Sequence, residues 1–152
     1  MGYLLIITII FIIDLVIKTI VEQKCKQGEE KSYCEGKFII QKYHNKGFAL
    51  NAFEKYPKFV ANGPALLCGG MFATLLVLLL KKGYGAVKLA LSLIIGGAAS
   101  NIYDRYSKHY VVDYIRFGVK WKWLREIVFN FSDFCIIAGT ILLVLSQINK
   151  KE

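Results

Sequence analysis

Two aspartates stand out because each lies among apolar residues. Asp113 lies within the strand-forming run at 111–117, and Asp133 follows Phe131 and Ser132 near the start of an apolar block. An unpaired carboxylate in such surroundings favours its protonated form. If the fold brought the two carboxyl groups to about 3 Å, they would share one proton. One member could then act as a base toward water and the other as an acid toward a peptide carbonyl or leaving nitrogen, which is the chemistry of peptide hydrolysis.

The sequence lacks the residues that competing hydrolytic chemistries require. The two histidines, His44 and His109, do not have the spacing of a zinc site, and there is no glycine-rich phosphate loop or serine nucleophile elbow. Cys25 and Cys34 are separated by eight residues and have no matching His or Cys cluster, which makes zinc binding a poor explanation for them. A disulfide between them stays open, since it requires an oxidising exterior. We expect neither a metal nor a cofactor.

Ionisable residues also interrupt the first apolar block, where their burial is costly and suggests a functional site. Lys18 follows Asp14 by one helical turn, so the two side chains share a face. For Lys18, the alternative to a role in a site is a structural ion pair near the membrane boundary. Asp14 is better explained by a site than by helix association alone.

Two later apolar blocks carry polar residues at helical spacing. Asn101, Asp104 and Arg105 form one polar face at the end of the third block. For Asp104, an Asp–Arg pair that only terminates the helix is the alternative. Asn130 lies one turn before Asp133 and shares its face in a segment that is otherwise apolar. The pair at the start of the fourth block is therefore the stronger functional candidate.

The elements that must position these residues follow from the distribution of apolar residues. The chain has 152 residues, of which 55% are hydrophobic. A transmembrane helix needs about 20 mostly apolar residues. Four blocks approach or meet that length, at residues 2–21, 59–80, 86–103 and 127–148, and two long loops cover residues 22–58 and 105–126. We predict a single, mainly α-helical membrane domain with four transmembrane helices.

The two long loops contain strand-forming segments. Residues 38–44 are typical of a strand, followed by a turn at 45–47 and a second extended piece, and residues 111–117 are typical of another strand. A small β-sheet beside the helices is therefore expected. Trp121 and Trp123 alternate with lysines, which suits either the membrane–water interface or packing inside that sheet.

The formal net charge of +9 does not indicate nucleic acid binding, because no nucleic-acid-binding motif accompanies it. The basic residues instead flank the apolar blocks, where they can meet anionic head groups. The positive-inside rule would place Lys81, Lys82, Lys88 and the tail residues Lys150 and Lys151 in the cytoplasm. The two long loops hold more basic residues in total, so charge alone leaves the orientation undecided.

The polar residues fall into motifs that resemble those of the lipoprotein (type II) signal peptidases. The resemblance covers nearly the whole chain, with the motifs in the same order as in that family. The matching segments are Asp14 with Lys18, Asn45-Lys46-Gly47-Phe48-Ala49, Gly96-Gly97-Ala98 with Asn101, Asp104 and Arg105, Val111-Val112-Asp113-Tyr114, and Phe129-Asn130-Phe131-Ser132-Asp133. Small departures from the family pattern, at Leu15, Leu50, Ser100, Tyr114 and Ser132, remove no group that the chemistry needs.

The resemblance implies roles for these residues and a place for the protein. Asp113 and Asp133 would be the catalytic pair. The residues that would bind substrate or support the pair are Asp14, Lys18, Asn45, Gly47, Asn101, Asp104, Arg105 and Asn130. The implied reaction removes the signal peptide from diacylglyceryl-modified prolipoproteins, just before the lipidated cysteine. The protein would be a monomer in the bacterial cytoplasmic membrane, with both termini in the cytoplasm and the sheet and active site at the outer leaflet.

Two other functions compete with this interpretation. A proton-coupled transporter could use Asp14, Arg105 and Asp133 as a relay, but it would be expected to show inverted repeats, and the sequence has no internal symmetry. A non-catalytic assembly factor could bind other helices through the small residues at 96–99. That function gives no reason for two carboxylates embedded in apolar segments.

Overall fold

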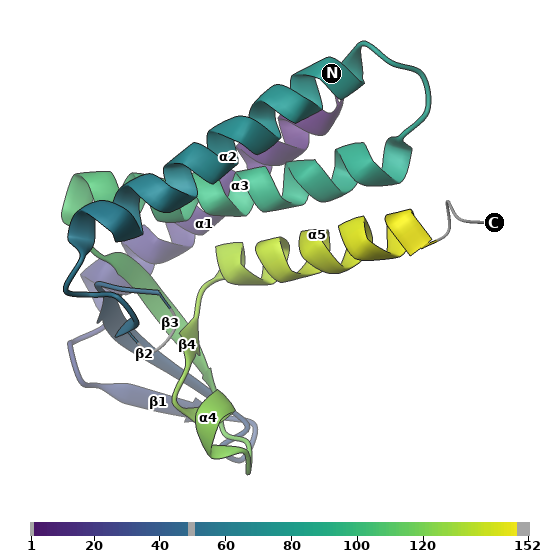
Figure 1. Ribbon diagram of the computed structural model, residues 1–152. Helices are drawn as coiled ribbons and strands as arrows, with labels where there is room; N and C mark the ends of the chain where they lie inside the picture. The colour runs from purple at the N-terminus through teal and green to yellow at the C-terminus, as the bar shows by residue number, and fades with distance from the viewer. Residues whose placement is uncertain (1, 49–50, 149–152) are drawn as a thin grey trace.

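The computed structural model describes residues 2–48 and 51–148, which form four long helices with a small sheet at one end (Figure 1). The long helices are α1 (Gly2–Lys24), α2 (Pro57–Leu79), α3 (Gly85–Lys108) and α5 (Phe131–Ile148). Each is long and apolar enough to cross a membrane. The predicted fold class, four transmembrane helices with a small β-sheet, is confirmed.

Helix α3 is the centre of the bundle, because α1, α2 and α5 all pack against it. Small residues allow these close approaches. A Cβ atom added to Gly97 would lie 2.5 Å from the carbonyl oxygen of Ser132 in α5, and one added to Gly96 would lie 3.0 Å from Cβ of Ile10 in α1. Neither position has room for a larger side chain. The run of small residues in α3 thus sets the distances between the helices that carry the polar groups.

Four antiparallel strands form the sheet in the order β1-β2-β3-β4. They are β1 (Glu30–Tyr33), β2 (Phe38–Asn45), β3 (Val111–Phe117) and the short β4 (Val128–Phe129). The register pairs Tyr43 with Asp113 and Asn45 with Val111, so the end of β2 lies beside the start of β3. This register brings the first long loop next to Asp113.

The structure differs from the sequence-based expectations at several boundaries. The fourth apolar block contains β4 as well as α5, and α3 continues to Lys108, past the end of its apolar block. The expected second extended piece after the turn at 45–47 is bent at 46–48 and helical or turn-like from Asn51 to Lys55, while Ala49 and Leu50 lie outside the described residues.

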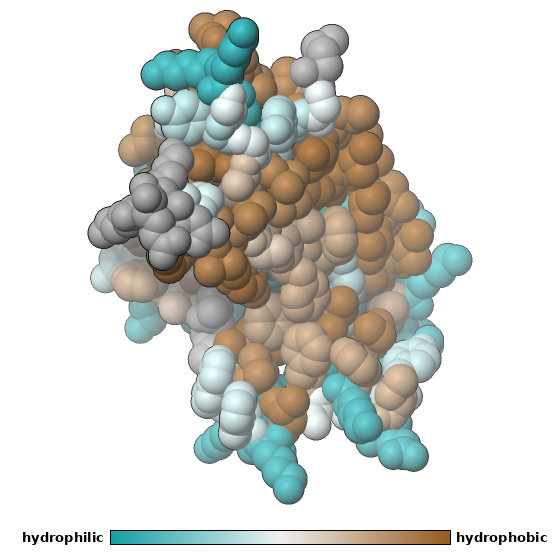
Figure 2. Space-filling model, turned by 90° about the vertical axis from the view of Figure 1, so that its right-hand side faces the viewer, coloured by the Kyte–Doolittle hydropathy of each residue, from teal (hydrophilic) through white to brown (hydrophobic). Residues whose placement is uncertain are grey.

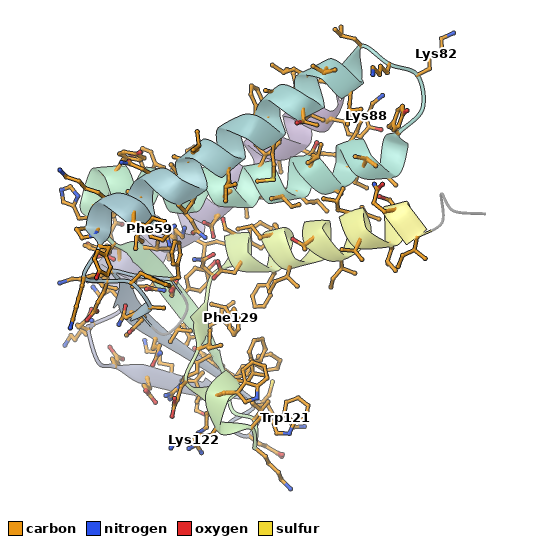
Figure 3. All side chains as sticks on the ribbon, in the orientation of Figure 1. Phe59, Lys82, Lys88, Trp121, Lys122 and Phe129 are labelled. Carbon is orange, nitrogen blue, oxygen red and sulfur yellow. The ribbon has the colours of Figure 1, made fainter. Side chains whose placement is uncertain are left out.

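The two tryptophans do not pack inside the sheet. Trp121 immediately precedes a single helical turn, α4 (Lys122–Arg125), and Trp123 lies within that turn. Their side chains are 67% and 61% exposed, respectively. In Figure 3, Trp121 and Lys122 lie at the far edge of the sheet, whereas Lys82 and Lys88 lie at the opposite end of the helices. Exposed indole rings at that edge suit the membrane–water interface.

The surface of the helices carries the apolar residues that a soluble protein would bury. Leu66 on α2 is 80% exposed, and Ile141 and Val144 on α5 are each 55% exposed. Figure 2 shows a broad hydrophobic band between two hydrophilic ends. Such an extensive apolar surface is stable in lipid rather than in water.

Candidate active site

Asp113 and Asp133 lie in the wall of one cavity of about 350 Å³, although they are 20 residues apart in sequence and belong to different elements. Asp113 comes from β3 and is 2% exposed. Asp133 comes from the first turn of α5. The fold therefore brings together the two carboxylates that the sequence singled out.

Asn130 connects the two carboxylates directly. Its backbone N–H donates to Oδ2 of Asp133 (3.0 Å), and the backbone N–H of Asp133 donates to Oδ1 of Asn130 (2.9 Å). This reciprocal pair is a capping box, which explains why α5 begins after Asn130. The remaining side-chain group of Asn130, Nδ2, donates to Oδ1 of Asp113 (2.7 Å). One buried residue thereby starts the helix and fixes both carboxyl groups.

Two more asparagines complete the hydrogen bonds to the carboxylates. Nδ2 of Asn45 donates to Oδ2 of Asp113 (2.9 Å), and Nδ2 of Asn101 donates to Oδ1 of Asp133 (3.0 Å). Each of the four carboxylate oxygens therefore accepts one amide N–H. These neutral donors hold the carboxyl groups in place without an ion pair in direct contact with either one among the described residues.

A fully buried charged network lies beside the two carboxylates. Nζ of Lys18 lies 2.7 Å from Oδ2 of Asp14 and 3.3 Å from Oδ2 of Asp104. It also donates to Oδ1 of Asn101 (2.7 Å) and to Oγ of Ser100 (3.3 Å). All these groups except Asn101 are 0% exposed. Lys18 is thus more than an ion-pair partner of Asp14, because it contacts an asparagine that holds Asp133.

Asp14 and Asp104 tie the network to neighbouring elements. Asp14 accepts hydrogen bonds from Oγ of Ser100 (2.6 Å) and from the backbone N–H of Ser132 (3.2 Å), which links α1 to α3 and α5. Asp104 accepts from the backbone N–H of Val112 (3.3 Å), which links α3 to β3. Asp104 pairs with Lys18 and Lys108 rather than with Arg105, so the Asp–Arg pair considered as an alternative does not form.

Arg105 and Gly47 close one side of the cavity. Nη2 of Arg105 donates to the carbonyl oxygen of Gly47 (3.1 Å), and its guanidinium lies 5.6 Å from the centre of the Phe48 ring. A side chain at Gly47 would collide with the backbone of Asn51 and Ala52. The turn after β2 therefore needs glycine to fold closely against residues 51 and 52. Ala49, the last residue of the predicted motif, lies outside the described residues.

Burial raises the pKa of Asp113 to about 7, and the negative charge of Asp133 adds to the effect. The hydrogen bonds from Asn45 and Asn130 oppose this shift by favouring the charged form. The net result is a carboxyl group that keeps its proton up to near-neutral pH. Such a group beside a second carboxylate suits acid–base chemistry.

Sequence analysis missed several residues that shape the site. Ser100 and the backbone of Ser132 hold Asp14, and Oη of Tyr114 accepts a hydrogen bond from the backbone N–H of Phe131 (2.9 Å). Ser100 lies one residue before Asn101, but a small polar residue in a helix gives no signal of its own. Cys25 and Cys34 are free in the described part of the chain, and Cys34 is exposed.

Comparison with known proteins places this arrangement in a family. The model of the family described as signal peptidase (SPase) II matches residues 6–149. The lipoprotein signal peptidase of Clostridium tetani is 33% identical over 146 residues, covering 93% of this chain and 89% of the relative. That of Halothermothrix orenii is 31% identical over 144 residues, covering 93% and 91%. A solved bacterial membrane enzyme has the same fold, with a TM-score of 0.84 at 22% identity, covering 99% of this chain and 90% of that one. The chain therefore belongs to the signal peptidase (SPase) II family of aspartic peptidases and is a multi-pass membrane protein.

Proposed function

We propose that this protein removes signal peptides from diacylglyceryl-modified prolipoproteins and that Asp113 and Asp133 are its catalytic pair. The observation that carries the proposal is the meeting of these two carboxylates in one cavity, where each oxygen accepts an amide hydrogen bond. Aspartic proteases use two neighbouring carboxyl groups that share one proton. Family membership supplies the reaction class, and the geometry supports the choice of these two residues.

The two carboxylates have different environments, which supports different roles for them. Asp133 lies in the first turn of α5, where it accepts the backbone N–H of Asn130 (3.0 Å), a hydrogen bond that stabilises a carboxylate. Asp113 is buried in the sheet and has a raised pKa. We therefore place the shared proton mainly on Asp113 in the resting enzyme. Asp133 is the base and Asp113 is the acid.

The reaction then follows in two steps. Asp133 takes a proton from water as the water oxygen adds to the scissile carbonyl carbon, while the proton on Asp113 is donated to the developing oxyanion. The tetrahedral intermediate collapses when the proton held by Asp133 passes to the leaving nitrogen and the C–N bond breaks. Asp113 recovers its proton from the hydroxyl group as the carbonyl re-forms. The pair returns to its starting state with one proton.

The shape of the cavity supports entry of substrate from the membrane. Beyond the carboxylates its wall continues along the helices as Pro64 of α2, Ala98 of α3, and Ile136 and Ile137 of α5. Both α2 and α5 pack on α3, so this apolar wall lies between two helices that reach the lipid. A signal-peptide segment and acyl chains would be accepted by such a surface. The protein would act as a monomer, since one chain supplies every group used here.

The decisive experiment compares two precursors with the purified protein. We expect cleavage of a diacylated prolipoprotein peptide before its modified cysteine and none of the unacylated peptide. Asp113→Asn and Asp133→Asn, made singly, should each lower the rate by at least a hundredfold. Glu30→Gln is the matched control, because Glu30 is half exposed and pairs only with Arg116 in the described part of the chain. Near-normal cleavage by either aspartate variant would remove the pair from the mechanism.

A further inference from the structure

A second, smaller cavity lies on the other side of Arg105 from the two carboxylates. Its volume is about 220 Å³, below the roughly 300–1,000 Å³ that is typical of sites for drug-sized ligands. We call it the basic pocket. Its lining consists of Lys46, Pro57, Lys58, Val60, Ala61, Asn62, Arg105, Tyr106 and His109. These residues come from the loop after β2, the start of α2 and the end of α3.

The lysines of the basic pocket have no acidic partner in the described part of the chain. Lys46, Lys58 and Arg105 are cationic, and His109 adds a further nitrogen donor. Within the described part of the chain no carboxylate lines the pocket, and none of these four residues forms an ion pair. The nearby carboxylate of Asp104 is already paired with Lys18 and Lys108. The two lysines therefore lack a counterion among the described residues, while Arg105 lies near the carboxylates of the active site without forming an ion pair with them.

Arg105 has unused hydrogen-bonding capacity next to this pocket. Its Nη2 donates to Gly47, but its buried Nε has no hydrogen-bond partner among the described residues. A buried donor without a partner is costly. The side chain lines both the basic pocket and the active-site cavity. An anion in the basic pocket would therefore rest against the residue that separates it from the reacting groups.

The position of the basic pocket indicates what kind of anion it meets. Figure 1 shows that α2 begins and α3 ends at the same end of the bundle as the sheet. Exposed aromatic side chains surround that level: Tyr56 is 63% exposed, Phe59 57% and Tyr106 56%. Aromatic residues of this kind mark the head-group region of a bilayer. Lysine and arginine side chains at that level attract the head groups of anionic phospholipids.

We propose that the basic pocket binds the phosphate of an anionic phospholipid through Lys46, Lys58 and Arg105. Lysines serve as point charges for phosphate, and a guanidinium adds directional donors. Beside these cations the pocket is lined by Val60 and Ala61 of α2, which are apolar. The pocket thus offers cationic side chains for the phosphate of a lipid and apolar side chains beside them.

The test measures lipid binding to the purified full-length protein by native mass spectrometry, without any precursor. The probes are dioleoyl phosphatidylglycerol, dioleoyl phosphatidylcholine and inorganic phosphate. We expect one phosphatidylglycerol molecule to bind in preference to phosphatidylcholine. Lys46→Gln combined with Lys58→Gln should weaken that binding roughly twenty-five-fold, since each lysine near a membrane surface contributes about five-fold to attraction of anionic lipid. Lys58→Glu alone should also weaken it.

The matched control is Lys120→Gln combined with Lys122→Gln, which removes the same charge from exposed lysines outside the pocket. It should keep the wild-type affinity for phosphatidylglycerol. Equal loss in both double variants would reduce the effect to general surface charge and overturn the proposal. Displacement of the lipid by an equal concentration of inorganic phosphate would assign the pocket to free anions instead. Because cleavage is not measured, neither result bears on the catalytic pair.

Discussion

The orientation of two asparagine side-chain amides determines which hydrogen bonds the two carboxylates accept. Nζ of Lys18 can only donate, so the carbonyl oxygen of Asn101 must face Lys18 and its NH₂ must face Asp133. In the same way, the backbone N–H of Asp133 requires the carbonyl oxygen of Asn130, which turns its NH₂ toward Asp113. Lys18 therefore acts on the site through Asn101, at one remove from the reacting atoms.

The raised pKa of Asp113 predicts how the rate depends on pH. Burial and the charge of Asp133 keep the proton on Asp113 up to about pH 7. As pH rises through that value the proton is lost, and the pair then has two negative charges and no acid. Cleavage of a diacylated peptide, measured from pH 5 to 9, should therefore decline above about pH 7. A rate that stays constant from pH 6 to 9 would contradict a protonated Asp113 in the working enzyme.

Removal of Lys18 should harm both stability and rate. Lys18→Met leaves Asp14 and part of the Asp104 charge buried without their cation, which costs about 3–5 kcal/mol. Lys108→Met is a matched control, because Lys108 also pairs with Asp104 but is 25% exposed. Its cost should be about 1 kcal/mol or less. The measurement is thermal unfolding in detergent, with cleavage assayed below both transitions, where only Lys18→Met should be slow. Equal effects of the two variants would refute the special position of Lys18.

At the level of elements, apolar length predicted the helices and strand-forming residues predicted β2 and β3, but the boundaries depended on single contacts. The capping box between Asn130 and Asp133 sets the start of α5. The sequence pattern indicates these two residues as site residues but not as a helix cap. The course of the chain around Trp121 was missed because a single helical turn has too few residues to show a period.

Close packing of α3 against α5 should be sensitive to one methyl group. In Gly97→Ala the new Cβ would lie 2.5 Å from the carbonyl oxygen of Ser132, so α5 must shift away from α3. The shift separates Asp133 from Asn101, and such overpacking typically costs about 1–3 kcal/mol. We expect a lower melting temperature and a lower cleavage rate.

Gly69→Ala provides the comparison for that variant. Gly69 lies on α2, and an added Cβ there meets nothing within 4 Å. It should melt and cleave like the wild type. If Gly97→Ala also behaved like the wild type, the α3–α5 contact would have more tolerance than the packing indicates.

At the scale of the whole molecule, sequence patterns identified the members of the site but not their contacts. Asp113 and Asp133 could be chosen from the apolar residues around them, yet their meeting depends on β3 pairing with β2 while α5 packs on α3. The network through Ser100 and the basic pocket beside Arg105 also join distant segments. No local period encodes such contacts, because only the packed bundle brings the segments together.

The proposed orientation, with the sheet outside the cell, can be tested with the chain's own cysteines. Cys34 is exposed at the sheet end of the molecule, whereas Cys25 is half-buried and Cys68 and Cys135 are buried. A membrane-impermeant maleimide should therefore label Cys34 in intact cells or protoplasts, and Cys34→Ser should lose most of that signal. Lys82→Cys, added to Cys34→Ser, places a thiol in the α2–α3 connection at the opposite end. It should react only after the membrane is permeabilised. The reverse pattern, in which the residue 82 thiol is labelled first, would place the active site at the cytoplasmic face and remove the outer-leaflet part of the proposed function.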